Sequence, residues 1–223
     1  MVFCVLRKNE RQNSSPQKLT PMKILFVCLG NICRSVTAEE VFRTLARRAG
    51  VGDQFTVDSA GMIDYHEGEL ADSRMRACAQ RRGYHLTHRS RPVRKEDFSR
   101  FDLIVAMDDN NVRQLHNAAP SEEAKQKVVR MADYLTEHPH TFIPDPYYDG
   151  PEAFDLVVTL LEDACAELLR RVEQHEYDPT LMSEEEFFQK INEAEEAYNN
   201  GKYTTLNPGE SVSDMLKRCG YDI

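Results

Sequence analysis

The sequence predicts a three-layer α/β fold, in which helices cover both faces of a doubly wound parallel sheet of about four strands. Three observations support this prediction. Apolar runs of strand length alternate with amphipathic helical segments over residues 22–175, which is the order typical of α/β proteins. After Lys23 the first run is continuously apolar, as expected for a strand buried on both faces. It ends in a polar loop, and such folds bind ligands at the carboxyl ends of their strands.

The expected strands are short apolar segments. The clearest is MKILFVC at residues 22–28. Two more, QFTVDS at 54–59 and FDLIVAM at 101–107, carry the β-branched and aromatic residues that favour strands. A fourth, KVVRMADYL at 127–135, has a weaker pattern.

Helical patterns separate these strands. They cover residues 36–49, residues 72–82, a segment after Asp109 and residues 152–174. Gly50 and Gly83 follow the first two, where a helix C-cap favours glycine. The longest pattern carries one apolar face that predicts packing on the sheet, made of Phe154, Val157, Val158, Leu161, Ala164, Leu168 and Val172.

Composition excludes several classes of protein. The chain has 223 residues and 41% hydrophobic content, enough for one sizeable domain with appendages. It contains no apolar stretch of membrane-spanning length and no secretory signal, so we expect a cytoplasmic protein that does not bind membranes. A net charge of −9 argues against a nucleic-acid partner. Six scattered cysteines without a CxxC pair predict neither a disulfide framework nor a metal site.

The chain divides into three predicted parts. Residues 1–21 are polar and lack periodicity, which predicts a disordered leader, and Met22 is an alternative natural start. Residues 22–175 form the main domain. Residues 176–223 carry 11 acidic and 4 basic residues and read as a mostly helical acidic extension. Docking on the main domain, dimerisation and binding of a partner protein all remain open for this extension.

The loop VCLGNICRS, residues 27–35, has the chemistry of an anion site. A tight turn from a strand into a helix N-terminus favours a bound anion and draws Cys28 toward its reactive thiolate form. Arg34 can grip two oxygens of one phosphate, and Ser35 can donate a hydrogen bond to the sulfur. Gly30 is expected to allow close backbone approach and a positive φ, and Asn31 to tolerate the left-handed region.

This loop closely resembles the signature V-C-x-G-N-x-C-R-S of the low-molecular-weight protein tyrosine phosphatases. Three further segments resemble the family in the same order: VDSAG at 57–61, KEDFSRFDLIVAMD at 95–108 and PDPYYDG at 144–150. The resemblance implies a flavodoxin-like fold. It also implies hydrolysis of phosphotyrosine in proteins, and of small aryl phosphates, through a phosphocysteine intermediate and without a cofactor.

The resemblance also implies a role for particular residues. Cys28 would be the nucleophile, Arg34 the phosphate clamp, and Asp145 the general acid and then base. The rest of the loop would bind the phosphate, namely Leu29, Gly30, Asn31, Ile32, Cys33 and Ser35. Asn31 and Ser35 would join a supporting hydrogen-bond network with Ser59 and His88. An aromatic rim for the phosphotyrosine ring would come from Tyr65, Tyr147 and Tyr148.

Three other functions are compatible with parts of the sequence but fit it less well. A thiol-dependent arsenate reductase would need more cysteines than Cys78 in the relay region. A protein-arginine phosphatase is the closer alternative, although the apolar Ile32 favours a phosphoaryl group. A domain that only binds phosphorylated partners would be expected to have lost Cys28 or Asp145, and both are present.

Met62 and Ile63 depart from bacterial relatives and are expected to reshape the pocket mouth. Cys28 and Cys33 share one tight loop, so a protective disulfide is predicted, as the resemblance also implies.

Overall fold

The computed structural model describes residues 21–174, so the predictions for residues 1–20 and for the 176–223 extension lie outside the described residues. Four parallel strands form one sheet in the order β2-β1-β3-β4. They are β1 (Met22–Cys28), β2 (Phe55–Gly61), β3 (Leu103–Ala106) and β4 (Val128–Arg130). The doubly wound, flavodoxin-like α/β fold is therefore confirmed.

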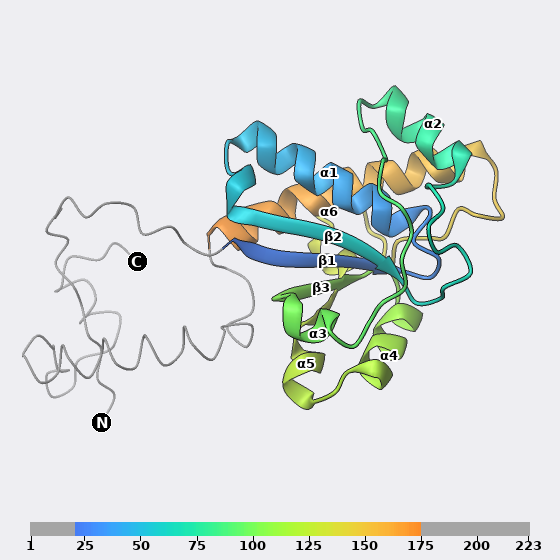
Figure 1. Ribbon diagram of the computed structural model, residues 1–223. Helices are drawn as coiled ribbons and strands as arrows, with labels where there is room; N and C mark the ends of the chain where they lie inside the picture. The colour runs from blue at the N-terminus through green and yellow to red at the C-terminus, as the bar shows by residue number, and fades with distance from the viewer. Residues whose placement is uncertain (1–20, 175–223) are drawn as a thin grey trace, which may run out of the picture. The chain divides into compact units, whose positions relative to one another are not determined.

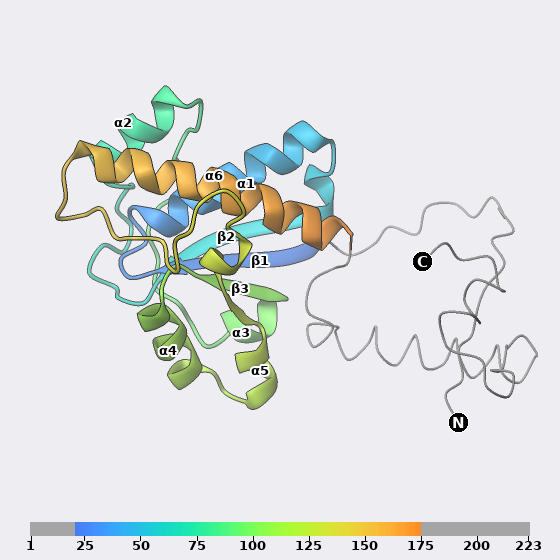
Figure 2. The ribbon, with the colours of Figure 1, turned by 180° about the vertical axis from the view of Figure 1, so that it is seen from behind.

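Helices cover both faces of the sheet (Figures 1 and 2). One face carries α1 (Arg34–Ala49) and α6 (Pro151–Glu173), with α2 (Ser73–Arg81) packed against α6. The opposite face carries α3 (Asp97–Arg100), α4 (Asp109–Ala118) and α5 (Glu122–Gln126). Two short 3-10 turns, η1 (Gly52–Gln54) and η2 (Met131–Tyr134), complete the described elements.

The position of β1 in the sheet explains why its sequence is apolar from Ile24 onward. Side chains of a strand point alternately to opposite faces. Ile24 and Phe26 lie in the larger core beneath α1 and α6, whereas Leu25 and Val27 lie in the smaller core beneath α4. All four are fully buried, because both faces of β1 are covered.

Most predicted elements occur, with shifted ends. The helix expected from residue 36 begins at Arg34 and ends at Ala49, and Gly50, with a φ of +79°, forms the left-handed C-cap. The whole predicted apolar face of α6 is buried. The predicted fourth strand is shorter than expected, because Met131–Tyr134 turn into η2. The short helices α3 and α5 were not predicted.

The topology brings distant residues to one edge of the sheet. The carboxyl ends of β1 and β3 are neighbours, so the loop after Cys28 lies close to Asp108, which follows β3. Ile143 is tied to the same edge, because its N–H donates to the Met107 carbonyl at 2.9 Å. No helix in the described part of the chain is long and apolar enough to cross a membrane.

Candidate active site

The loop over residues 28–35, called the cradle below, curls around the Cys28 side chain. The Cys28 sulfur lies 3.0 Å from the Ser35 hydroxyl and accepts the Asn31 N–H at 3.3 Å. Asn31 has a φ of +56°, as expected, but the predicted positive φ at Gly30 is wrong, because Asn31 makes the left-handed step alone. A Cβ on Gly30 would lie 3.3 Å from the His66 ring, a tight contact that a small shift of this side chain would relieve.

Asn31 is the centre of a buried hydrogen-bond network. Its Nδ2 donates to the hydroxyls of Ser35 and Ser59, both at 2.9 Å. Its Oδ1 accepts the Arg91 N–H at 3.0 Å and lies 3.2 Å from the His88 Nε2. The structure therefore brings together the four residues of the predicted network. Arg91 is an addition that the sequence did not indicate, because its backbone makes the contact.

A charged layer supports this network from behind. The Ser59 hydroxyl donates to Glu39 at 2.6 Å, and the His88 Nδ1 lies 3.1 Å from the same carboxylate. Burial raises the pKa of Glu39, but hydrogen bonds from His88 and Ser59 and the charge of Arg43 outweigh burial and hold that pKa below its usual value. Sequence reasoning missed Glu39, because a glutamate inside an amphipathic helix resembles any surface residue.

Glu39, Asp58 and His88 have a spacing that could hold a metal ion. Both carboxylates already have cationic partners, since Arg43 pairs with Glu39 and Arg91 pairs with Asp58 at 2.8 Å. Each carboxylate of this group is therefore already held by an arginine side chain.

Arg34 is buried at the side of the cradle. Its Nη1 donates to Asp108 at 2.6 Å and to the Ile143 carbonyl at 3.2 Å, and its Nη2 donates to Asp145 at 2.5 Å. Burial alone would lower the pKa of Arg34, but the charges of Cys28, Asp145 and Asp108 raise it above its usual value, so Arg34 remains a cation. Its Nε is buried without a hydrogen-bond partner among the described residues, which leaves one donor for an anion.

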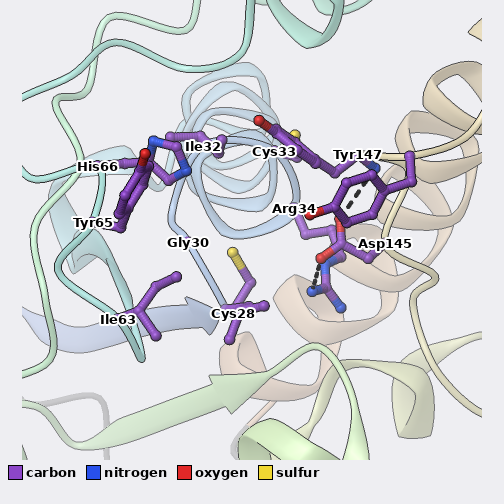
Figure 3. A pocket seen from close by; sticks show the side chains of 12 residues that line it. Cys28, Gly30, Ile32, Cys33, Arg34, Ile63, Tyr65, His66, Asp145 and Tyr147 are labelled. Carbon is purple, nitrogen blue, oxygen red and sulfur yellow. Dashed lines mark hydrogen bonds and ion pairs between the residues drawn. The ribbon is translucent and has the colours of Figure 1, made fainter.

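A pocket of about 370 Å³ opens above the cradle, with Cys28 and Arg34 at its base (Figure 3). Asp145 and Tyr147 line one side, and Ile63, Tyr65 and His66 line the other. The remaining lining residues are Leu29, Gly30, Ile32, Cys33 and Tyr148. Nearly all the sequence-predicted substrate residues thus converge on one cavity. Asn31 and Ser35 lie behind it, and His66 was not predicted.

The rim is more exposed than the base. Tyr65 is 81% exposed and Tyr148 is 94% exposed, whereas Tyr147 is only partly exposed and faces the cavity. Of the two departures expected at the mouth, Ile63 lines it, whereas Met62 packs against the smaller core instead. A planar ring entering between these side chains would meet aromatic surfaces on both sides.

Two charged residues near the pocket were missed by sequence reasoning. Asp108 anchors Arg34, and its position at the carboxyl end of β3 was the available signal. Arg74 contacts Tyr147 from α2, and its Nη2 donates to the Tyr147 carbonyl at 2.9 Å. Nothing in the local sequence connects these two residues, which are 73 positions apart.

The arrangement can hold a tetrahedral oxyanion against a thiol. The cradle leads into the N-terminus of the 16-residue α1, which favours negative charge. The thiol lies at the base and a carboxyl group lies at the wall of the same pocket, as attack and proton transfer on one bound group require.

Comparisons with known proteins agree with this geometry. The family model described as "Low molecular weight phosphotyrosine protein phosphatase" matches residues 23–178. A low molecular weight protein-tyrosine-phosphatase of Streptomyces coelicolor is 41% identical over 154 residues, covering 68% of this chain and 94% of its own length. A low molecular weight phosphotyrosine protein phosphatase of Sus scrofa is 34% identical, covering 67% of this chain and 94% of its own length. A crystal structure of a protein tyrosine phosphatase from Entamoeba histolytica matches with a TM-score of 0.68 and 46% identity, covering 70% of this chain and 99% of that chain.

Proposed function

Since the chain belongs to the low molecular weight phosphotyrosine protein phosphatase family, we propose that it hydrolyses phosphotyrosine in proteins through a phosphocysteine intermediate on Cys28. One observation carries the proposal: the Cys28 sulfur, the Arg34 guanidinium and the Asp145 carboxyl line a single pocket. The Entamoeba histolytica structure holds Hepes in its active site. Hepes ends in a sulfonate, a tetrahedral oxyanion like phosphate, which supports the same kind of ligand here.

The first step transfers the phosphoryl group to the enzyme. The Cys28 thiolate attacks phosphorus, an S–P bond forms, and the bond from phosphorus to the aryl oxygen breaks. The electron pair leaves on that oxygen, which takes the proton of Asp145. Cradle N–H groups and Arg34 hold the phosphoryl oxygens, whose charge is redistributed in the transition state.

Arg34 changes partner when phosphate binds. In the structure its Nη2 pairs with Asp145 and its Nη1 with Asp108. A phosphate that takes the Nε and Nη2 edge competes with Asp145 and frees this carboxyl to face the leaving oxygen. Asp108 keeps the other edge fixed, so the guanidinium stays oriented.

The second step releases phosphate. Asp145, now a carboxylate, takes a proton from water as that water attacks phosphorus, and the S–P bond breaks to return the Cys28 thiolate. Ser35, 3.0 Å from the sulfur, stabilises the departing thiolate by a hydrogen bond. Asn31 holds the Ser35 hydroxyl in place.

Aromatic and apolar walls favour phosphotyrosine over phosphoarginine. Ile32 and Ile63 line the pocket together with Tyr65 and Tyr147, which suits a flat apolar ring better than a charged guanidino group. Arsenate reduction is less well supported, because Cys78 lies on α2, where its thiol donates to Asp155 of α6 at 3.0 Å.

The test is an assay of the full chain on phosphotyrosine, phosphoarginine and phosphoserine peptides, with an acid quench to trap the intermediate from radiolabelled substrate. We expect turnover of phosphotyrosine peptides and label on the peptide that contains Cys28. Preference for phosphoarginine would overturn the substrate, and label on another residue would overturn the mechanism.

The remaining sequence predictions stay proposals. Residues 176–223 are proposed to regulate or dock the catalytic domain, to dimerise or to bind a partner, and a cytoplasmic location is proposed with them. Comparing the full chain with one that ends at Gln174, in activity and in oligomeric state, separates these roles.

A further inference from the structure

Arg74 lies in the first turn of α2 and contacts Tyr147 in two ways. Its Nη2 donates to the Tyr147 carbonyl at 2.9 Å. Its guanidinium carbon also lies 5.4 Å from the centre of the Tyr147 ring and 4.7 Å from that of the Phe154 ring, within range of cation–π attraction. Arg74 therefore holds both the backbone and the ring of Tyr147 against α2 and the first turns of α6.

Asp72 fixes the Arg74 guanidinium from the other side. Its Oδ1 accepts the Arg74 backbone N–H at 2.8 Å and the Nε at 3.0 Å, while its Oδ2 accepts the Nη2 at 2.9 Å. The hydrogen bonds from Arg74 hold the pKa of the Asp72 carboxyl below its usual value, so the pair stays charged at neutral pH. Paired hydrogen bonds of this kind fix the orientation of an arginine fork as well as its position.

The same contacts connect the cradle to the carboxyl group at the pocket wall. The Asp72 N–H donates to the Ile32 carbonyl of the cradle at 2.8 Å. At the other end, the Tyr147 N–H donates to the Asp145 Oδ1 at 3.3 Å. Figures 1 and 2 show α2 beside the segment that leads into α6. A continuous path of contacts thus runs through Ile32, Asp72, Arg74, Tyr147 and Asp145.

We propose that Arg74 is a positioning residue, which sets the distance between the Asp145 carboxyl and the cradle by holding Tyr147. The inference rests on the proposed function, because it requires Asp145 to be the proton donor. Arg74 does not line the pocket and its side chain is 47% exposed, so it acts through Tyr147 rather than on substrate. A misplacement of about 1 Å can cost a catalytic step roughly 100-fold, so looser anchoring should be measurable.

The test compares substrates that differ in their need for a proton. Phenyl phosphate has a poor leaving group and p-nitrophenyl phosphate a good one, so only the first depends strongly on the acid. We expect Arg74→Met to lower kcat/KM about tenfold for phenyl phosphate and less than about twofold for p-nitrophenyl phosphate. The inhibition constant of inorganic phosphate should not change. The kcat/KM of Arg74→Lys for phenyl phosphate should lie between those of wild type and Arg74→Met, because an ammonium group keeps the charge but lacks the forked donors of a guanidinium.

Arg81→Met is the matched control. Arg81 lies on the same helix and pairs with Asp155 at 3.3 Å, in an exposed ion pair outside the pocket. Its loss should change kcat/KM for neither substrate. If Arg74→Met does not fold, Arg74→Lys carries the same comparison.

The outcomes separate the positioning role from the proposed function. Equal losses on the two substrates would show that Arg74 supports the fold alone and would overturn the inference. Added to Asp145→Asn, Arg74→Met should cause no further loss on phenyl phosphate, and an additive loss would also overturn it. Failure of Asp145→Asn to discriminate the substrates would instead refute the proposed acid. If Asp145→Asn affects phenyl phosphate more than p-nitrophenyl phosphate but Arg74→Met affects both equally, only the positioning role of Arg74 is overturned.

Discussion

The cradle and the 144–150 segment meet in one pocket but are held in different ways. In the cradle, Asn31, Arg34 and Ser35 are almost fully buried, and hydrogen bonds fix both ends of the Asn31 amide and the Ser35 hydroxyl. In the 144–150 segment, the Asp145 side chain is 39% exposed and Tyr148 lies almost wholly in solvent. The segment is held chiefly through the Arg34–Asp145 pair and the Arg74–Tyr147 contact.

The difference indicates which changes should cost stability and which should cost only catalysis. A buried, fully partnered polar network is expensive to break, because each lost partner leaves another group unsatisfied. An exposed carboxylate contributes little to the free energy of unfolding. Substitutions in the buried hydrogen-bond network around Asn31 should therefore lower both stability and activity, and substitutions in the 144–150 segment should lower activity alone.

The largest effect is expected at the nucleophile. Cys28→Ser should lower turnover by about 10⁴-fold or more, because the hydroxyl is a much weaker nucleophile than the thiolate. Binding of inorganic phosphate should persist, because the cradle N–H groups and Arg34 remain. Isothermal titration with phosphate and an aryl phosphate assay measure the two quantities. Substantial turnover by the variant would contradict the phosphocysteine route.

The next effect is expected at Asp145. Asp145→Asn should lower kcat/KM for phenyl phosphate by about 10²- to 10³-fold, and for p-nitrophenyl phosphate by about tenfold at most. The free energy of unfolding should change by less than about 1 kcal/mol, since the side chain is partly exposed. Urea unfolding checks the second expectation. A large loss of stability would remove the contrast between the two regions.

Substitution of Asn31, at the centre of the cradle, should cost more stability and less activity than substitution of Asp145. Asn31→Ala removes two donated hydrogen bonds and puts alanine, which tolerates the left-handed region less well than asparagine, at a φ of +56°, so we expect a loss of about 2–4 kcal/mol in the free energy of unfolding. Activity should fall about 10- to 100-fold, because Ser35 loses its orientation. Asn31→Gly loses the same hydrogen bonds without the strain, so it should be about 1 kcal/mol more stable than Asn31→Ala. Equal stability of the two variants would show that the left-handed backbone is not strained.

The charged layer behind the cradle predicts a pH dependence. The pKa of Glu39 is lowered in the folded state, so its ionised form contributes stability above the unfolded value of 4.5, and this stability is lost as pH falls through the folded pKa. Glu39→Gln should cost about 3 kcal/mol at pH 7, and less at acidic pH. Urea unfolding at neutral and acidic pH measures both. The exposed Glu122→Gln is the control and should change neither value; a pH-independent cost at Glu39 would contradict the argument.

Sequence reasoning succeeded where the signal is local. The two-sided burial of β1 follows from a continuous apolar run, the apolar face of α6 follows from helical periodicity, and the cradle follows from one contiguous string. The left-handed step was wrongly given to Gly30, because glycine and asparagine both tolerate it and only tertiary contacts choose Asn31. Arg74 and Asp108 were missed, because their partners lie 73 and 74 positions away and are set by how α2, α6 and β3 pack.

The smallest effect on basal activity is expected at Cys33, which lies in the cradle and also lines the pocket. Burial, followed by the charge of Cys28, raises the pKa of the Cys33 thiol well above its usual value. Cys33 should therefore stay protonated while peroxide oxidises Cys28 to a sulfenic acid. The Cys33 sulfur then loses its proton as it attacks the sulfenic sulfur: an S–S bond forms, the S–O bond breaks, and the departing hydroxide takes the proton and leaves as water.

This disulfide would protect Cys28 from further oxidation, and a dithiol would reverse it. Wild type and Cys33→Ala should have similar activity before treatment, within about twofold. After mild peroxide, both should lose activity, and a dithiol should restore the wild type but only a small part of Cys33→Ala. Cys165→Ala is the matched control, because Cys165 is equally buried but packs against α1 and lies outside the pocket. Equal recovery of all three proteins would leave Cys33 as a packing residue, so that the cradle would protect its nucleophile by burial alone.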